Sequence, residues 1–133
     1  MIPLIQKKIS TPDGLIHGSC FRTCLASILE IDVDLIPAFE DMGTKWHEPF
    51  FEFLHEHNLE LEGTGRIGNK FHDDLFPVYE GIDGYVITNG SSPREWVTRG
   101  HSVIYKNGVM VHDPHPSGEG LKEVQDYYMI KRK

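Results

Sequence analysis

The alternation of hydrophobic and polar residues along the chain predicts two helices followed by several short strands. In the segment 20–30, apolar residues recur with the i, i+3, i+4, i+7 spacing of a half-buried helix. In the segment 46–58, large apolar side chains also gather on one side, which predicts a second helix. Alternating or β-branched runs predict strands at 59–62, 85–88, 101–105, 109–112 and 124–130. Because the helices precede the strands, the sequence predicts an α+β fold with an antiparallel sheet.

The segments between these elements are predicted to be turns and loops. A turn is expected at 11–14, inside an irregular first stretch of the chain. The segment 63–81 is rich in glycine and has little periodicity, so a loop-rich connection is predicted there. The segment 89–94 is also predicted as a loop, in which Ser92 and Pro93 are typical of the start of a helical turn.

Composition and charge narrow the classes of function. The length fits one domain, which is predicted to span residues 1–133. The chain has 13 Lys and Arg against 20 Asp and Glu, a formal net charge of -7, which argues against binding to a nucleic-acid backbone or an anionic membrane surface. No apolar run approaches the roughly 20 residues that span a bilayer, and the first residues lack the apolar region of a signal peptide. The sequence therefore predicts a cytoplasmic protein and leaves its oligomeric state open.

The chain has two cysteines, Cys20 and Cys24, four residues apart on the first predicted helix. At that spacing their Cβ atoms are about 5–6 Å apart, whereas a disulfide requires about 3.5–4.5 Å. Two free thiols are therefore expected, as in a reducing compartment. Cys24 falls on the apolar stripe and is interpreted as a small buried hydrophobic residue.

Cys20 is predicted to be the first residue of its helix. Gly18 interrupts the preceding chain, and Ser19 is a favourable N-cap residue. The free N–H groups and the positive end of the helix dipole stabilise a thiolate at this position. Cys20 is therefore a candidate nucleophile.

The strands 101–105 and 109–112 are predicted to form a hairpin that carries the base for this nucleophile. A two-residue turn at Asn107-Gly108 would place His101 and Asp113 on opposite faces of the sheet. A three-residue turn with a glycine bulge would instead pair His101 with Asp113, about 4.5–5.5 Å apart at Cβ. The three-residue turn is the prediction, because the carboxylate could then orient the imidazole as the third member of a catalytic triad.

Three segments together resemble a known family: the residues Gly-Ser-Cys at 18–20, Gly-His-Ser-Val-Ile at 100–104 and Val-His-Asp-Pro at 111–114. Their order is similar to that of the papain-like cysteine peptidases. The nearest likeness is to the bacteriocin-processing branch that cleaves at a double glycine, with its small bacterial and phage-encoded relatives. The resemblance implies a helix carrying Cys20 packed on an antiparallel sheet carrying His101 and Asp113.

The resemblance also implies an oxyanion hole. In that family a glutamine before the cysteine supplies one donor, and Gln6 is the only glutamine before Cys20. Gln6 is therefore expected to take this role, with the backbone N–H of Cys20 as the second donor. The chain departs from the family pattern at Phe21, where a glycine is common, and in the distance from Gln6 to Cys20, which is 14 positions where the family has only a few.

The implied activity is that of a cysteine hydrolase or acyl transferase that cleaves an amide, isopeptide or thioester bond of a peptide or protein. It uses neither a cofactor nor a metal ion. The transglutaminase-like branch has the same Cys-His-Asp order, so transfer to an amine remains an alternative to hydrolysis. A non-catalytic binding protein on the same fold, for example one encoded by a phage, is a further alternative.

Two other kinds of site are weaker alternatives. A zinc ion could be bound by Cys20 and Cys24 with two of the histidines 101, 112 and 115, although zinc cysteines usually lie on a knuckle rather than a helix. The segment 63–68 matches the glycine spacing of a dinucleotide-binding loop but lacks a strand–turn–helix frame.

Other residues that could shape a cleft are interpreted as structural or as surface residues. The loop 112–118 is either a cleft wall or a proline-stiffened exit from a strand. Arg94 and Arg99 are expected at the solvated surface, with binding of an anionic group as the alternative. Trp46 and Trp96 are expected in the core, with a place on the cleft as the alternative.

Overall fold

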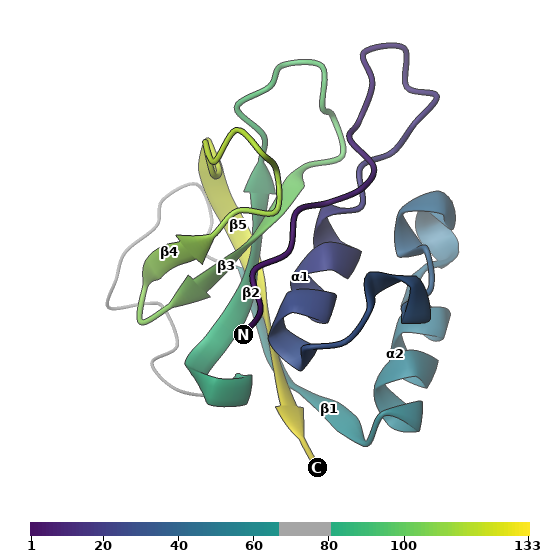
Figure 1. The fold of residues 1–133 in the computed structure, drawn as a ribbon, viewed down its shortest axis with the longest axis vertical. Helices are drawn as coiled ribbons and strands as arrows, with labels where there is room; N and C mark the ends of the chain where they lie inside the picture. Colours follow the sequence, from purple (N-terminus) through teal and green to yellow (C-terminus); the bar gives the residue numbers. More distant parts are fainter. Residues whose placement is uncertain (67–80) are drawn as a thin grey trace.

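The computed structural model describes residues 1–66 and 81–133. In these residues it has two α-helices and a five-stranded sheet in which every neighbouring pair of strands is antiparallel (Figure 1). The helices are α1 (Cys20–Leu29) and α2 (His47–Glu56), and the strands are β1 (Leu59–Arg66), β2 (Tyr85–Ser91), β3 (His101–Lys106), β4 (Val109–His112) and β5 (Glu123–Arg132). The strand order is β1-β5-β2-β3-β4. The predicted α+β class is therefore confirmed.

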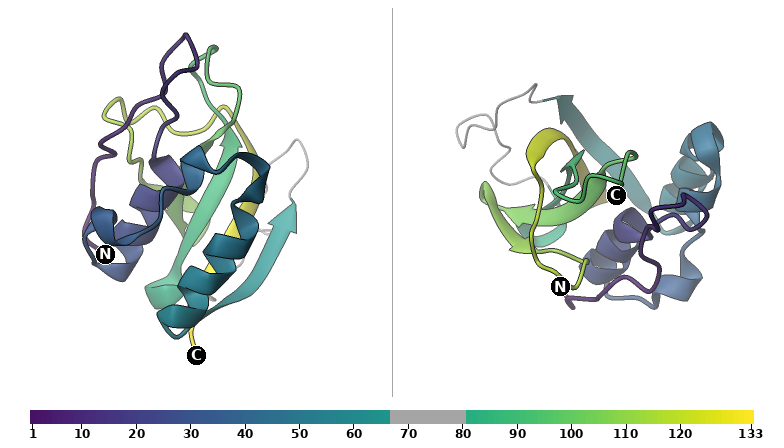
Figure 2. Two further views of the ribbon diagram at one scale, coloured as in Figure 1. Left: turned by 90° about the vertical axis from the view of Figure 1, so that its right-hand side faces the viewer. Right: turned by 90° about the horizontal axis from the view of Figure 1, so that it is seen from above.

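Both helices lie against one face of the curved sheet, so the molecule has two layers (Figure 2). α1 packs on β2 and β3, and α2 packs on β1. A hydrophobic core fills the space between the layers, and its largest fully buried side chains are Phe50, Leu25, Leu59, Ile87 and Ile104. Within the described part of the chain, no helix has the length and apolar character needed to cross a membrane.

The helices form close to where the apolar spacing predicts them. α1 begins at Cys20 and ends before Glu30, which adopts a left-handed conformation with φ 58°. The N–H of Ile31 then donates to the carbonyl of Ala26, which closes the last turn. α2 covers His47–Glu56 of the predicted 46–58, and it buries the apolar side chains expected on one side.

Two strands are longer than predicted, because pairing with distant strands extends them. β1 continues to Arg66 along β5, with a bulge between Leu61 and Gly63, so the first part of the predicted loop 63–81 is strand. The segment 67–80 lies outside the described residues. β2 continues through Gly90, where a Cβ would come within 1.8 Å of the carbonyl oxygen of Glu123 on β5. Glycine is therefore required there by the close approach of a neighbouring strand.

The segment after β2 also differs from its prediction. The chain leaves the sheet at Ser92 and forms a single turn, with the N–H of Val97 donating to the carbonyl of Arg94, and no helix. The hydroxyl of Ser92 accepts the N–H of Arg94 at 3.1 Å. This is the hydrogen bond of a capping serine, as predicted for Ser92, but only one turn follows it.

The predicted three-residue hairpin turn is wrong. Lys106 pairs with Val109, so the turn has two residues, Asn107 and Gly108, both at positive φ (54° and 77°). Asn-Gly suits this turn because its twist matches that of the flanking strands. A bulge follows, since Tyr105 pairs with Met110 but Ile104 pairs with His112.

The bulge restores the alternation that the observed two-residue turn alone would have lost. One extra residue on β4 shifts every later residue to the opposite face. The register beyond Ile104 and His112 therefore brings Asp113 beside Val103, on the same side of the strand as His101. The chain reaches the predicted juxtaposition of His101 and Asp113 by a different turn and a compensating bulge.

Candidate active site

A cleft of about 540 Å³ opens beside the first turn of α1. Its lining combines aromatic side chains, such as Phe21 and Trp46, with polar ones, such as His101 and Arg94. Cys20 also lines it and is half-buried. The three segments that meet here are far apart in the sequence: the first residues of the chain, the start of α1 and the start of β3.

The sequence places Cys20 at the first position of α1, and the structure agrees. Ser19 is the N-cap residue, but its side chain makes no capping hydrogen bond, contrary to expectation. Its hydroxyl instead accepts the N–H of Lys8 at 3.3 Å, while its carbonyl accepts the N–H and the hydroxyl of Thr23. The cap side chain therefore leaves the first N–H groups of the helix open to a ligand beside the thiol.

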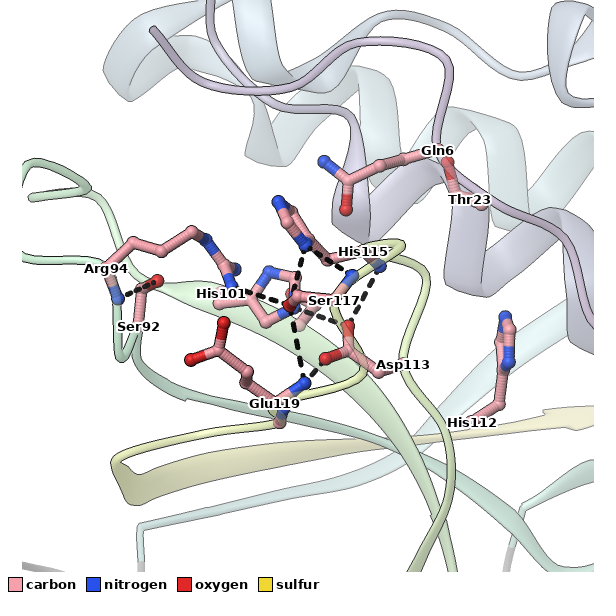
Figure 3. Close-up of polar contacts among 12 residues, drawn as sticks. Gln6, Thr23, Ser92, Arg94, His101, His112, Asp113, His115, Ser117 and Glu119 are labelled. Atoms are coloured by element: carbon pink, nitrogen blue, oxygen red, sulfur yellow. Dashed lines mark hydrogen bonds and ion pairs between the residues drawn. The ribbon is translucent and has the colours of Figure 1, made fainter. Parts of the chain in front are cut away.

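His101 and Asp113 form a buried pair. The Nε2 atom of His101 lies 2.7 Å from Oδ1 of Asp113, and both side chains are almost fully buried. Asp113 also accepts the backbone N–H groups of His115 at 2.9 Å and Gly120 at 2.8 Å (Figure 3). Because Nε2 is occupied by the carboxylate, Nδ1 is the ring nitrogen left for Cys20.

The electrostatics of the three groups favour the charged forms. Burial alone would raise the pKa of the Cys20 thiol, but the hydrogen bond and charge of His101, with hydrogen bonds from Ser102, lower it below its ordinary value. Burial would lower the pKa of His101, but Asp113 and Cys20 raise it to about 9. Burial likewise opposes ionisation of Asp113, yet hydrogen bonds from His101 and from two backbone N–H groups lower its pKa. A thiolate facing an imidazolium is the state that these contacts stabilise.

Gln6 reaches the cleft although it lies 14 positions before Cys20 in the sequence. The intervening chain forms a loop whose ends are joined, because the N–H of Ser19 donates to the carbonyl of Lys8 at 3.1 Å. The N–H of Gln6 donates to the carbonyl of Pro114, just beyond Asp113. Backbone hydrogen bonds therefore tie Gln6 to the loop that follows β4, and its neighbour Lys8 to the start of α1.

The side-chain amide of Gln6 is oriented by its surroundings. It is 6% exposed, and Nε2 donates to the carbonyl of Lys8 at 2.8 Å. A Cβ at Gly18 would come within 3.0 Å of this Nε2, so the glycine leaves room for the amide beside the start of α1. Lys8 uses one N–H of the amide, the second N–H has no partner among the described residues, and Oε1 is a buried oxygen without a hydrogen-bond partner.

A second polar network, which was not predicted from the sequence, reaches the thiol from the sheet. The hydroxyl of Ser102 donates to Oδ1 of Asn89 at 2.5 Å, and Nδ2 of Asn89 donates to Asp126 at 2.7 Å. All three residues line the cleft, and Ser102 lies close enough to Cys20 to help lower the pKa of its thiol. The signal in the sequence is weak: the three residues stand on three different strands, and they align only because Asn89 pairs with Ser102 on one side and with Asp126 on the other.

Aromatic rings form the apolar part of the cleft. The ring of Phe21 makes edge contacts with Phe39, Trp46, Phe50 and Tyr128, with centroids 5.5–6.3 Å apart. The departure from the family pattern at position 21 thus supplies the centre of an aromatic cluster.

The two tryptophans differ from each other. Trp46 joins this aromatic cluster and also lines the cleft, as a core residue at its edge. Trp96 was expected in the core but is 49% exposed. Its Nε1 lies 3.4 Å from the carbonyl oxygen of Ser10, so it joins the 92–100 loop to the N-terminal loop instead of filling the core.

The remaining histidines do not assemble a metal site. His112 points away from His101, and its Nε2 lies 2.6 Å from the carbonyl oxygen of Leu4 (Figure 3). Cys24 is completely buried. Across residues 1–66 and 81–133, no three His, Cys, Asp or Glu side chains are placed to hold a metal ion, so the zinc alternative has no support in this geometry.

The glycine-spaced segment 63–68 does not form a phosphate loop in the part that is described. Its first four residues belong to β1 and pair with β5. They therefore lie inside a strand, where a dinucleotide-binding loop would require a turn into a helix. The remaining two residues lie outside the described part of the chain.

No family model, no curated protein and no solved structure matches this chain. The chemistry of the cleft is therefore inferred from the positions of its own side chains.

Proposed function

We propose that the protein is a papain-like cysteine hydrolase or acyl transferase that acts on an amide, isopeptide or thioester bond of a peptide or protein. One observation carries the proposal. Cys20, at the start of α1 and on a cleft, is electrostatically coupled to His101, and His101 is held by Asp113 at 2.7 Å. Cys20 thus faces a base, and the base is held by a group that orients it.

The first half of the reaction uses the thiolate of Cys20. It attacks the substrate carbonyl carbon, and the electron pair of the C=O bond moves to the oxygen. The backbone N–H of Cys20 and the second N–H of Gln6 Nε2 stabilise this oxyanion. The tetrahedral intermediate collapses, its bond to the leaving nitrogen or sulfur breaks, and Nδ1 of protonated His101 gives its proton to the leaving group.

The second half releases the acyl group. His101, now neutral, accepts a proton from water or from an amine, whose oxygen or nitrogen attacks the thioester. The C–S bond breaks, and the thiolate and imidazolium return to their starting state. Asp113 keeps the imidazole ring in one orientation throughout and stabilises its charged form. The reaction balances without any cofactor.

The free thiols agree with a cytoplasmic setting for this activity, because a reducing compartment keeps a catalytic cysteine reduced.

The proposal is tested by trapping the acyl-enzyme. Purified protein is mixed with a peptide thioester, and thiol release is followed alongside mass spectrometry of the protein. We expect a burst of thiol equal to the amount of protein, with one acyl group on Cys20, followed by slower turnover. Adding a small amine in competition with water then separates transfer from hydrolysis by the product formed.

Two variants serve as matched controls. Cys20→Ala should abolish the burst and the adduct, and Cys24→Ala should retain both. Turnover that persists without Cys20 would place the activity elsewhere. If Cys20 alkylates rapidly at neutral pH but is never acylated by thioesters or by a peptide library, the catalytic proposal fails and a binding function takes its place.

A further inference from the structure

Arg94 is held at the cleft by contacts from two loops. Its backbone N–H donates to the hydroxyl of Ser92, which fixes the turn, and its Nη1 donates to the hydroxyl of Ser117 at 3.2 Å. The same hydroxyl lies 2.8 Å from Nδ1 of His115. Figure 3 shows the Arg94 side chain extending towards Ser117 and the histidines. The guanidinium is thus pre-positioned, with most of its donors unused.

The charged side chains that line the cleft differ in their partners. Glu40 pairs with Lys8 at 2.7 Å and with Arg22 at 2.9 Å, and Asp126 accepts the amide of Asn89. Among residues 1–66 and 81–133, by contrast, no carboxylate forms an ion pair with either cleft arginine, Arg94 or Arg99. Arg94 bonds only to a hydroxyl, and Arg99 only to the backbone carbonyl of Glu40. Each guanidinium therefore keeps donors that no carboxylate of the described residues occupies.

In the proposed reaction the leaving group takes its proton from His101, so it departs on the side of the cleft where His101 lies. The rings of His101 and His115 have centroids 6.2 Å apart, and the charge of Arg94 reaches His115 strongly enough to help lower its pKa, after the larger effect of burial. His115 and Arg94 share the hydroxyl of Ser117 as a hydrogen-bond partner, so the guanidinium lies on the same side of the cleft as His101. The aromatic cluster around Phe21 borders Cys20 itself. A group that departs on the His101 side therefore comes near Arg94.

We infer that the substrate carries a carboxylate on the leaving-group side of the cleaved bond and that Arg94 binds it. This inference rests on the proposed function and names the substrate class. The carboxylate can come from an acidic side chain or from the C-terminus of a peptide, and the guanidinium can hold either by paired hydrogen bonds. Arg94 is thus a specificity-determining residue, and the bond-making and proton-transfer steps remain with Cys20 and His101.

The test compares four peptides with one acyl part. After the cleaved bond they carry a Glu amide, a Gln amide, an Ala with a free carboxylate, or an Ala amide. We expect kcat/KM to be about tenfold higher for the carboxylate member of at least one pair, a difference that falls with ionic strength. Comparing the two pairs shows which source of the carboxylate is preferred.

Variants locate the preference. Arg94→Gln should bring the ratio close to one, and Arg94→Glu should reverse it in favour of a Lys peptide. The matched control is Arg132→Gln, which removes the same charge at the end of β5 that pairs with Leu59, and it should keep the wild-type ratio. Equal kcat/KM for charged and neutral peptides in wild type, or a ratio unaffected by Arg94→Gln, would overturn the inference.

A binding measurement distinguishes a failure of this inference from a failure of the proposed function. Fluorescence anisotropy of the same peptides on the Cys20→Ala protein needs no catalysis. Tighter binding of the carboxylate peptides that is lost with Arg94→Gln supports the inference even if wild type cleaves none of them. Equal binding of charged and neutral peptides refutes it, even if wild type cleaves both.

Discussion

Two cysteines lie one turn apart on α1, and their surroundings give them opposite properties. Cys20 lines the cleft, and His101 lowers the pKa of its thiol although burial opposes this. Cys24 is completely buried, and burial, with the charges of Cys20 and Asp113, raises the pKa of its thiol well above the usual range. The same helix therefore carries one thiol suited to attack and one that is inert.

The position of a cysteine on the helix is therefore only part of what makes it a nucleophile. Cys20 is at the N-terminus of α1, where N–H groups favour a negative charge. A second contribution comes from β3, which places His101 and Ser102 beside the thiol. Cys24 is one turn further along and faces the core, where burial and two nearby groups raise the pKa of its thiol.

The largest effect is expected when this partner is removed. His101→Ala leaves burial to act on Cys20, so the pKa of the thiol should rise to or above the ordinary value of about 8.5. Turnover should fall by about a thousandfold, because the proton donor is lost as well. The measurement is the rate of iodoacetamide alkylation of each cysteine against pH, read by peptide mass spectrometry.

The pH dependence of the wild-type protein is predicted as well, both for alkylation and for turnover. Alkylation of Cys20 should persist below pH 7 and exceed that of Cys24 throughout. Turnover should rise as the Cys20 thiol ionises and fall as His101 loses its proton, at about pH 9. A Cys20 profile that is identical in wild type and His101→Ala would remove the base from the site.

Gln6→Ala is expected to have the second largest effect, and it separates activation of the thiol from stabilisation of the oxyanion. Removing one oxyanion donor typically lowers kcat by about 10²–10³. Because Gln6 makes no contribution to the lowered pKa of Cys20, the alkylation profile should not change. A parallel loss of alkylation would show that Gln6 acts by holding the start of α1, and Gln6→Glu, which keeps the shape but replaces the amide donor, is the matched comparison.

Ser102→Ala should have a smaller effect, confined to the thiol. The change removes the hydroxyl that contacts Cys20 but leaves the backbone N–H of residue 102 and the whole of His101. We expect a modest rise in the pKa of Cys20 and a loss of activity of about tenfold or less. Asn89→Asp tests the same network at its next member: if Ser102 only fills space, neither variant will move the alkylation profile.

The sequence predicts the parts of this comparison that depend on local pattern. The apolar spacing places the start of α1 at Cys20 and turns Cys24 inward. The juxtaposition of His101 with Asp113 follows from strand alternation, which survives an error in the turn because the bulge in β4 compensates for it. These features need only neighbouring residues and one hairpin.

The rest depends on contacts between distant segments, which periodicity does not encode. Only the family resemblance indicated Gln6, and the hydrogen bonds between Lys8 and Ser19 that bring it to the cleft close a loop of unrelated sequence. The network from Ser102 to Asp126 requires β5 to lie beside β2, although a long stretch of chain separates these strands. Pairing with β5 also lengthens β1 beyond its own alternating residues.

The smallest effect on activity is expected at the other cysteine. Cys24→Ala removes a fully buried sulfur from the core, so the free energy of unfolding should fall by about 1–2 kcal/mol, as measured by urea denaturation. The alkylation profile and turnover of Cys20 should remain those of wild type. Cys24→Ser buries a hydroxyl at the same place and should destabilise the fold further, again without changing the Cys20 profile. If Cys24→Ala instead lowered the reactivity of Cys20 as much as Ser102→Ala does, the two thiols would have to be treated as one coupled site, and the contrast between a reactive and a structural cysteine would fail.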